Sequence, residues 1–350
     1  MGKKRNWMIL CCILGLVWLS GCTSSSQEEK KVPEMKVGIL VYRKEDTFLG
    51  TIVEAFEAAA KYAEQQENIK ISVSVMDGRG SQAVQTGQIE KCIDQKYDVI
   101  CVNLVDRTVA ASIIDQAKAA QIPLIFFNRE PVKEDLERWD KVYYVGAVAK
   151  ESGILQGHLI ADAYLNNPER FDKNNDQKLQ YVMLEGEQGH QDALLRTEYS
   201  IRTLVSEGIQ MDKLVNDTAN WHRSQAATKM SQWLEKYGNA IEVVICNNDD
   251  MALGAIDAYK AAKKLEELPF IVGIDGTPPA MEALAEGTLY GTIKNDEQKQ
   301  AQAMFQLCYS LVFHGKAESD YTLEKGKYIF INYLPVEREI DKVSTGNKEQ

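Results

Sequence analysis

Polar and aromatic side chains follow almost every segment of this sequence that has the pattern of a buried β-strand. Asp and Asn at such places commonly cap the helix that follows, and an aromatic residue there can equally pack in a core, so none of these residues identifies a site alone. In open α/β sheets, however, ligands bind beyond the carboxyl ends of the strands. The residues at these positions are Glu45, Asp46, Phe48, Asn128, Arg129, Glu130, Glu187–Asp192, Arg196, Trp221, Asn247–Asp250, Asp275, Asn295 and Asp296.

This combination of side chains suits a ligand rich in hydroxyl groups. A sugar hydroxyl donates one hydrogen bond and accepts up to two, while Asp accepts, Arg donates and Asn does both. The bonds to ionised Asp and Arg groups are the stronger ones. The C–H faces of a pyranose pack against flat rings, so Phe48 and Trp221 are candidates to stack on the two faces of one sugar.

The segments that must position these residues alternate between strand and helix. Continuous apolar runs are typical of strands covered by helices on both faces, and repeated βα units give a doubly wound parallel sheet with right-handed crossovers. A first series comprises Lys36–Tyr42, Thr51–Gln65, Lys70–Met76, Ala83–Gln95, Tyr97–Leu104, Thr108–Ala120 and Ile122–Asn128. A second series begins near Val142–Val145 and continues with Lys150–Tyr164, Leu179–Leu184, Leu194–Glu207, Asp212–Thr218, Ser224–Lys236, Ile241–Cys246, Asp250–Ala262 and Phe270–Ile274. The predicted fold class is α/β, with two doubly wound parallel-sheet lobes joined by a hinge.

The first residues have the pattern of an export signal. A basic start precedes the apolar run Met8–Leu19, and small residues follow, as in signal peptides. This run is too short for a comfortable membrane span, which needs about 20 residues. The tetrapeptide Leu19–Cys22 resembles a bacterial lipobox, which predicts that Cys22 carries a lipid tether. The alternative is an ordinary signal peptide with an incidental cysteine.

Composition restricts the class of protein. The chain has 350 residues, of which 45% are hydrophobic, and a net charge of −11. This length predicts about two domains and the composition excludes global disorder. No Lys/Arg-rich stretch recurs after the N-terminus, so we expect no nucleic-acid partner.

Four cysteines remain beyond the export segment, each in an apolar neighbourhood without metal-ligand spacing. Core packing is therefore the expected role, although a disulfide among them stays open for an exported protein. They are Cys92, Cys101, Cys246 and Cys308.

The segment Asp172–Gln180 has the composition of a Ca²⁺-binding loop. Positions 1, 3, 5 and 9 carry side-chain oxygens, and position 7 needs only a backbone carbonyl. Gln177 stands where the loop pattern has Gly, so we expect strained backbone there. A solvated turn is the alternative, because Met183 replaces the usual bidentate Glu. The expected ligands in the loop are Asp172, Asn174, Asp176, Lys178 (through its carbonyl) and Gln180.

Taken jointly, several segments resemble the galactose/glucose-binding family of type I sugar substrate-binding proteins. The resemblance extends over about residues 36–335. Its segments are Tyr42–Phe48, Asn103–Asp106, Phe126–Pro131, Tyr143–Gly146, Lys150–Gln156, Glu185–Arg196, Asp217–Trp221, Ile241–Asp249, Val272–Asp275 and Gly291–Asp296.

The resemblance implies a role for ten of the strand-end residues. Phe48 and Trp221 match the pair that stacks on the sugar, and Asp46 lies near the hydroxyl that distinguishes galactose from glucose. Arg196 matches the residue that bridges the ring oxygen and hydroxyls, and Glu242 matches a distant Glu that completes the Ca²⁺ site. The residues implied to bind hydroxyls are Asp46, Asn128, His190, Asp192, Arg196, Asn248, Asp275 and Asn295.

The domain organisation expected from the pattern and the resemblance has two discontinuous lobes. Residues 1–21 form the signal peptide with its lipobox, 22–35 a lipidated linker, and 342–350 a tail. The N-terminal lobe comprises 36–146 and 297–330, and the C-terminal lobe 147–296 and 331–341.

The expected function is the capture of D-galactose or D-glucose outside the cytoplasmic membrane and its delivery to the permease of an ABC importer. Lobe closure is hinge motion and needs no covalent chemistry, so we expect a monomeric binding protein with no enzyme activity, which contacts the membrane only through its lipid anchor. The alternative is a sensor or chemotaxis component for another sugar, with a chemoreceptor as partner.

Two other classes fit less well. A glycosidase needs two carboxylates that flank the scissile bond, whereas neutral amides and a charged Arg favour saturation of hydroxyls. A DNA-binding repressor with this fold is excluded because an export signal occupies the place of its DNA-binding helices.

Overall fold

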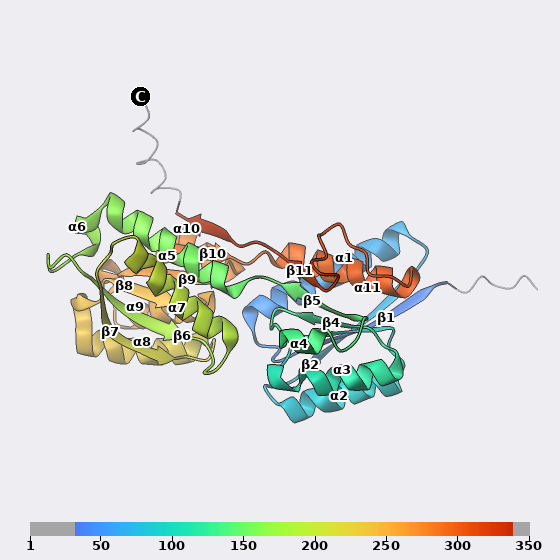
Figure 1. Ribbon diagram of the computed structural model, residues 1–350. Coiled ribbons are helices and arrows are strands. Elements are labelled where there is room, and N and C mark those ends of the chain that lie inside the picture. Colours follow the sequence, from blue (N-terminus) through green and yellow to red (C-terminus); the bar gives the residue numbers. More distant parts are fainter. Residues whose placement is uncertain (1–31, 339–350) are drawn as a thin grey trace, which may run out of the picture.

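The computed structural model describes residues 32–338, which form two lobes side by side (Figure 1). The predicted signal peptide, Cys22, most of the linker and the tail lie outside the described residues. Within these residues each lobe is built on one six-stranded sheet flanked by helices. This arrangement is the predicted α/β fold class.

The first sheet has the strand order β11-β5-β4-β3-β1-β2. Short strands such as β3 and β4 are wholly buried, as expected for strands with helices on both faces. The strands are β1 (Glu34–Val41), β2 (Lys70–Asp77), β3 (Val99–Val102), β4 (Leu124–Phe127), β5 (Val142–Gly146) and β11 (Tyr328–Phe330). The helices of this lobe are α1 (Thr47–Gln66), α2 (Gln82–Asp94), α3 (Ala110–Ala120), α4 (Lys133–Leu136) and α11 (Glu297–Phe313), with a 3₁₀ turn at Arg107–Val109.

The second sheet has the order β12-β10-β9-β8-β6-β7. Its strands are β6 (Leu179–Glu185), β7 (Met211–Thr218), β8 (Val243–Cys246), β9 (Phe270–Asp275), β10 (Gly291–Lys294) and β12 (Leu334–Glu337). The helices are α5 (Ala149–Asn166), α6 (Pro168–Phe171), α7 (Gln191–Ser206), α8 (Arg223–Tyr237), α9 (Asp249–Ala261) and α10 (Pro278–Glu286), with 3₁₀ turns at Gly238–Ala240 and Leu265–Glu267.

Two strands differ from the sequence expectation. The strand pattern alone starts the second series near Val142–Val145, but β5 pairs with β4 and β11 in the first sheet, the lobe to which the expected domain organisation assigns residues 36–146. In addition, β12 runs antiparallel to β10, so the second sheet is not wholly parallel. Local pattern cannot reveal either fact, because it does not say which strand lies beside which.

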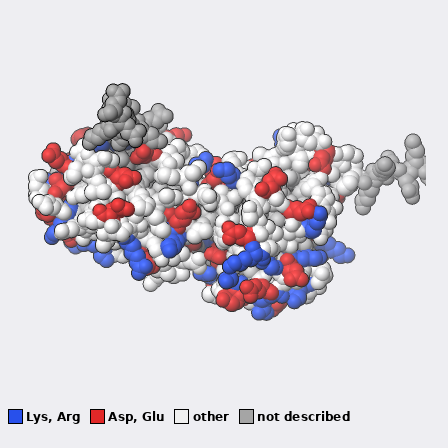
Figure 2. Space-filling view, turned by 45° about the horizontal axis from the view of Figure 1, so that its top comes forward, with Lys and Arg blue, Asp and Glu red and all other residues white. Residues whose placement is uncertain are grey.

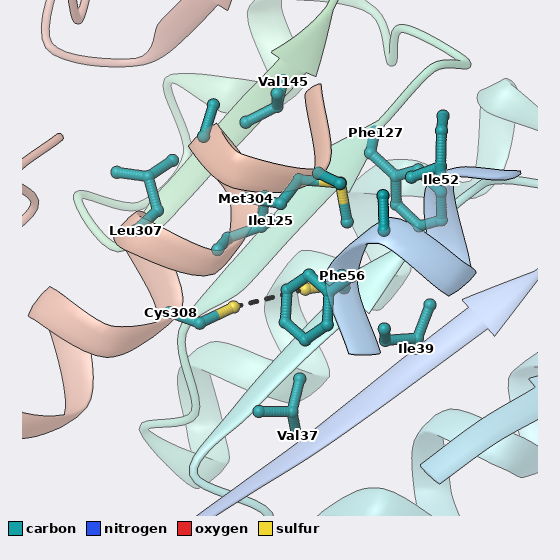
Figure 3. Packing of buried hydrophobic residues seen from close by; sticks show 14 of the residues in the cluster. Val37, Ile39, Ile52, Phe56, Ile125, Phe127, Val145, Met304, Leu307 and Cys308 are labelled. Carbon is teal, nitrogen blue, oxygen red and sulfur yellow. Dashed lines mark hydrogen bonds between the residues drawn. The ribbon is translucent and has the colours of Figure 1, made fainter. Parts of the chain in front are cut away.

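The chain passes between the lobes after β5, after β10 and after β11 (Figure 1). As a result α11, from late in the sequence, packs against α1 in the first lobe. Figure 3 shows this packing: Met304, Leu307 and Cys308 of α11 meet Phe56 of α1 and the apolar strands beneath. The Cys308 sulfur lies 3.5 Å from that of Cys101, and all four described cysteines are free and buried.

The surface carries charge of both signs. Figure 2 shows acidic and basic side chains interspersed over both lobes on the face in view. Among the described helices, none is both long and apolar enough to cross a membrane.

Candidate ligand-binding cleft

A small cavity, with about 40 Å³ of space for the centre of a water molecule, lies between the lobes, and nine of the ten predicted sugar-binding residues line it. They come from six strand ends and two lobes, as the sequence pattern predicted. Two further residues, Tyr42 and Arg129, complete the lining. The full set is Tyr42, Asp46, Phe48, Asn128, Arg129, His190, Asp192, Arg196, Trp221, Asn248 and Asp275.

Asp46 is fixed at the start of α1. Its Oδ1 caps the helix by accepting a hydrogen bond from the N–H of Leu49 (2.9 Å), and its Oδ2 accepts one from the hydroxyl of Tyr42 (2.7 Å). Phe48, one residue into the helix, is buried and belongs to the core cluster of this lobe. Asp46 is therefore a helix N-cap and Phe48 a core residue, as the alternative interpretations proposed, and both also line the cavity.

Asn128 and Arg129 follow β4. Asn128 adopts a left-handed backbone (φ 57°), and its Oδ1 accepts a hydrogen bond from the side-chain amide of Asn103 (3.0 Å). The guanidinium of Arg129 stacks over the Tyr42 ring at 3.6 Å. Contacts within the first lobe, from Asn103 to Asn128 and from Tyr42 to Arg129, therefore fix these side chains at the cavity.

His190 presents a defined tautomer to the cavity. Its Nδ1 accepts a hydrogen bond from the N–H of Asp192 (3.1 Å), so the proton of the neutral ring lies on Nε2 and is free for donation. Burial, together with the nearby Arg129 guanidinium, lowers the pKa of His190 to about 4 despite the opposing charge of Asp192. The ring is therefore neutral at pH 7.

Arg196 is the centre of a buried charged network. Its Nη1 donates to the carbonyl of Asn247 (2.7 Å) and its Nη2 to the hydroxyl of Tyr333 (3.2 Å). The carboxylates of Asp192 and Asp275 both lie 3.8 Å away. Burial raises the pKa of Asp275, while Arg196 opposes this rise. The Nε of Arg196 is buried without a partner among the described residues, which leaves a donor for a ligand.

The indole ring of Trp221 lies against Gly186, which has no side chain to obstruct it. The backbone of Trp221 is left-handed (φ 66°), which is uncommon for a bulky residue. A Cβ on Gly186 would lie 2.1 Å from the indole ring, so the ring can occupy this position only because residue 186 is glycine. Trp221 is 7% exposed and offers a flat face at the cavity.

Asn248 and Asn295 have different placements. Asn248 caps α9 by accepting from the N–H of Met251 (3.0 Å) and also lines the cavity. Asn295 does not line it: the side chain is buried, and its Oδ1 accepts a hydrogen bond from Gln300 of α11 (2.5 Å). Its backbone N–H donates to the carbonyl of Asp275 (2.9 Å). Asn295 thus lies outside the lining of the cavity, with its side chain bonded to α11 of the first lobe.

The lobes touch each other around the cavity. Thr47 of the first lobe donates to Asp250 of the second (2.8 Å), and Arg129 pairs with Glu187 (3.0 Å). On the same side the amide of Gln191 donates to Glu130 (3.2 Å). Further contacts join Arg43 to His222 and Arg107 to Gln191. The cleft is therefore closed over the predicted site residues.

The predicted Ca²⁺ loop has the expected backbone but no gathered carboxylates. Asp172 accepts from the N–H groups of Asp176 (3.0 Å) and Gln177 (2.8 Å), and Gln177 has the left-handed conformation (φ 63°) that the loop pattern predicted to be strained. Glu242 accepts from the N–H of Lys173 and of Gln180. Within residues 32–338, no three His, Cys, Asp or Glu side chains gather closely enough to hold a metal.

The remaining loop residues differ in their freedom to bind. The Oε1 of Gln180 is buried without a partner among the described residues, which fits a cation ligand. Asn174 and Lys178 each engage Asp176: the amide oxygen of Asn174 accepts from its N–H, and the N–H of Lys178 donates to its carboxylate.

Comparison with known proteins identifies the family. The sequence profile of the periplasmic binding protein domain matches residues 37–317. The chain belongs to the periplasmic binding protein family. The chain is 37% identical to the D-galactose/methyl-galactoside binding periplasmic protein of Haemophilus influenzae over 307 residues, which are 87% of this chain and 90% of that protein. It is 28% identical to a xylitol-binding protein of Mycolicibacterium smegmatis, over 78% of this chain and 69% of that one.

Solved structures of periplasmic binding proteins confirm the fold. An ABC transporter solute-binding protein of Bacillus halodurans with bound myo-inositol superposes with a TM-score of 0.72 at 26% identity, covering 90% of this chain and 99% of that one. The resemblance found in the sequence and the predicted fold class are both confirmed. The relatives named here bind different polyols, so family membership does not by itself select the sugar.

The sequence analysis noted Arg129 at a strand end and Tyr42 in a segment of the resemblance, but assigned neither a role in the site. Both stand at strand ends, Tyr42 directly after β1 and Arg129 after β4, so position alone was a signal. The sequence could not predict that the Arg129 guanidinium stacks on the Tyr42 ring, because that contact depends on the order in which the strands pair.

Proposed function

We propose that this periplasmic binding protein binds D-galactose or D-glucose in the interlobe cavity and delivers it to the permease of an ABC importer. The observation that carries the proposal is the convergence of nine predicted residues on one cavity between the lobes. Carboxylates, amides, two guanidinium groups, an imidazole and three other aromatic rings line it together. The 37% identity to a galactose-binding protein supports this choice of sugar.

The chemistry of the cavity supports a neutral, hydroxyl-rich ligand. Asp46, Asp192 and Asp275 supply acceptors, while the Nε of Arg196 and the Nε1 of Trp221 are buried donors without partners among the described residues. A hydroxyl can satisfy donors and acceptors at once, whereas an anion would oppose the carboxylates. A hexose of about 12 non-hydrogen atoms, at roughly −0.7 kcal/mol per atom, would bind with about −8 kcal/mol, near micromolar.

Calorimetric titration of the mature protein tests this proposal. D-Galactose, D-glucose, D-ribose, xylitol and myo-inositol are titrated under one condition. We expect galactose, glucose or both to bind near micromolar, and the other polyols to bind at least tenfold more weakly. If neither hexose binds while another polyol does, this protein serves that polyol, as a transport or sensor component.

We also propose Ca²⁺ at the loop Asp172–Gln180, closed by Glu242. The unpaired Oε1 of Gln180 and the backbone of the loop support it. The ion would have to draw Asp176 and Glu242 from their present hydrogen bonds, because their carboxylates do not gather. The residues that would hold it are Asp172, Asn174, Asp176, Lys178, Gln180 and Glu242.

Thermal unfolding tests the metal proposal. With chelator removed, Ca²⁺ should raise the Tm of the wild type, because a ligand that binds only the folded state stabilises it. Asp172→Asn with Asp176→Asn should abolish this shift, while Asp217→Asn, a surface carboxylate of the same lobe, should leave it intact. A wild-type Tm indifferent to Ca²⁺ at millimolar concentration rejects the site.

Attachment to the membrane is proposed through Cys22, which lies outside the described residues. Cys22→Ser should release the protein from the membrane fraction into the medium or periplasm, and mass spectrometry of the wild-type N-terminus should show the lipid. A chemoreceptor partner stays a prediction from the sequence.

A further inference from the structure

A fully buried carboxylate lies behind the cavity without lining it. Asp249 is 0% exposed, in the first turn of α9, and follows Asn248 of the cavity. Its Oδ2 accepts a hydrogen bond from the N–H of Thr277 (2.8 Å) and lies 3.4 Å from that residue's hydroxyl. Its Oδ1 accepts from the hydroxyl of Thr292 on β10 (2.6 Å). Asp249 therefore links the start of α9 to the turn after β9 and to the neighbouring strand β10.

The turn that Asp249 holds carries Asp275. Asp275 has φ 126° and Gly276 has φ 73°. The first value belongs to a region that is essentially restricted to glycine, and a non-glycine residue persists there only when its surroundings hold it. The hydroxyl of Thr292, which Asp249 orients, accepts from the N–H of Gly276 (3.3 Å). Asp249 therefore binds the N–H of Thr277 directly and is linked to the N–H of Gly276 through the Thr292 hydroxyl. These are the two residues that follow the strained position 275.

The fold makes room for this carboxylate. A Cβ on Gly273 of β9 would lie 2.2 Å from the Oδ1 of Asp249, so any side chain at residue 273 would displace it. Burial raises the pKa of Asp249, and the donors from Thr292, Thr277 and Gly276 oppose this rise. Burying a carboxylate costs free energy, and the hydrogen bonds from these donors offset that cost. A carboxylate that caps a helix at the surface needs no such set of buried donors.

We propose that Asp249 is the positioning residue of the sugar site. Its hydrogen bonds keep Asp275 and Gly276 in the positive-φ turn that directs the Asp275 carboxylate into the cavity, 3.8 Å from Arg196. It acts through Asp275 and does not touch the ligand. This inference deepens the proposed function and rests on it where affinity is the readout.

A double-mutant cycle with galactose tests the inference. Asp249→Asn presents an amide of equal size, which cannot accept from all three donors, and should weaken galactose binding at least tenfold. In the Asp275→Gly background, residue 275 adopts its backbone without strain and has no carboxylate to direct, so adding Asp249→Asn should cost less than twofold. In the Trp221→Ala background, which alters a different contact, the loss should persist in full.

The contrary results are clear. An equal loss in the Asp275→Gly and Trp221→Ala backgrounds would assign Asp249 a general structural role and overturn the inference. If Asp249→Asn does not fold, Thr292→Val removes the hydroxyl that links Asp249 to Gly276 and should show the same coupling to Asp275→Gly. Equal losses in both backgrounds would again reject the inference.

A second measurement needs no sugar and separates this inference from the proposed function. Amide hydrogen exchange of the ligand-free protein should show the N–H of Thr277 exchanging at least tenfold faster in Asp249→Asn, while the amides of β8 keep their rates. An unchanged Thr277 rate overturns the inference. If the wild type binds none of the sugars, the proposed function fails and the exchange rates still decide on Asp249.

Discussion

The two halves of the cleft differ in where their charged groups find partners. In the second lobe, Arg196 is surrounded by Asp192, Asp275 and Tyr333, all of the same lobe. In the first lobe, Arg129 stacks on its neighbour Tyr42, but its ionic partner Glu187 belongs to the opposite lobe. The second half therefore keeps its arrangement when the cleft opens, whereas part of the first half is completed only by closure.

This difference suggests an order of events. The second lobe offers a preformed charged and aromatic surface, and the first lobe adds Asp46, Phe48 and Asn128 as it closes. Preformed groups contribute most to affinity because little ordering is needed on binding. Variants in the second lobe should therefore have the larger effects.

The largest effect is expected for Trp221→Ala. Loss of this buried platform should cost about 2–4 kcal/mol of sugar affinity, roughly 30- to 1,000-fold. Trp221→Phe keeps a ring and should lose less. Calorimetry measures both, and wild-type affinity in Trp221→Ala would reject the stacking role.

Asp46→Ala tests the first lobe at its most polar position. It should weaken sugar binding by about 1–3 kcal/mol, since a buried hydroxyl would be left unpaired, and lower unfolding stability by about 1 kcal/mol through loss of the α1 cap. Asp46→Ser retains the cap, so denaturation and titration together separate the two losses. Normal sugar binding by Asp46→Ala would show that the first-lobe half of the site is misassigned.

The pH dependence of binding reports on both halves at once. The pKa of His190 is lowered from 6.5 to about 4 by burial and by Arg129 of the opposite lobe, so closure requires a neutral ring. We expect the ring to be more exposed when the cleft opens, so that its pKa returns toward 6.5. Affinity should then be full well above pH 6.5 and fall by about tenfold or more as pH decreases toward 4.

His190→Gln is the control for this pH effect, because it removes the titrating ring. The difference between wild type and variant across pH 4–7 isolates the contribution of His190 from that of the cavity residue Asp275, whose raised pKa acts in the opposite direction. Parallel curves for the two proteins would mean that His190 does not titrate on closure.

The smallest effect is expected for Glu187→Gln, which removes the ionic partner of Arg129 across the cleft. Affinity should fall about three- to tenfold through faster sugar release, with unfolding stability unchanged. Asp257→Asn, which breaks the exposed pair with Arg223 within one lobe, should leave release unaffected. Stopped-flow fluorescence measures the rates; equal rates in wild type and Glu187→Gln would show that closure does not depend on this pair.

The sequence by itself determined the kinds of groups at the strand ends and the elements that present them. Buried apolar runs predict strands locally, and Asp46 and Asn248 follow such runs as helix caps. Because parallel strands end at one edge of a sheet, this local information predicted that the strand-end residues lie near one another. The resemblance to the sugar-binding family then selected ten of them, and nine of these line the cavity.

Only the tertiary structure decided which strands, helices and side chains lie next to one another. The place of β5 in the first sheet, the return of α11 to α1, the stacking of Arg129 on Tyr42 and the turning of Asn295 toward Gln300 all depend on contacts between distant segments. Side-chain direction at a strand end follows from the packing of adjacent strands and helices, and no local pattern encodes that packing. For the same reason, the sequence placed Asp249 at a strand end but did not suggest its proposed role, which depends on the strained turn at residue 275 and on a glycine at residue 273.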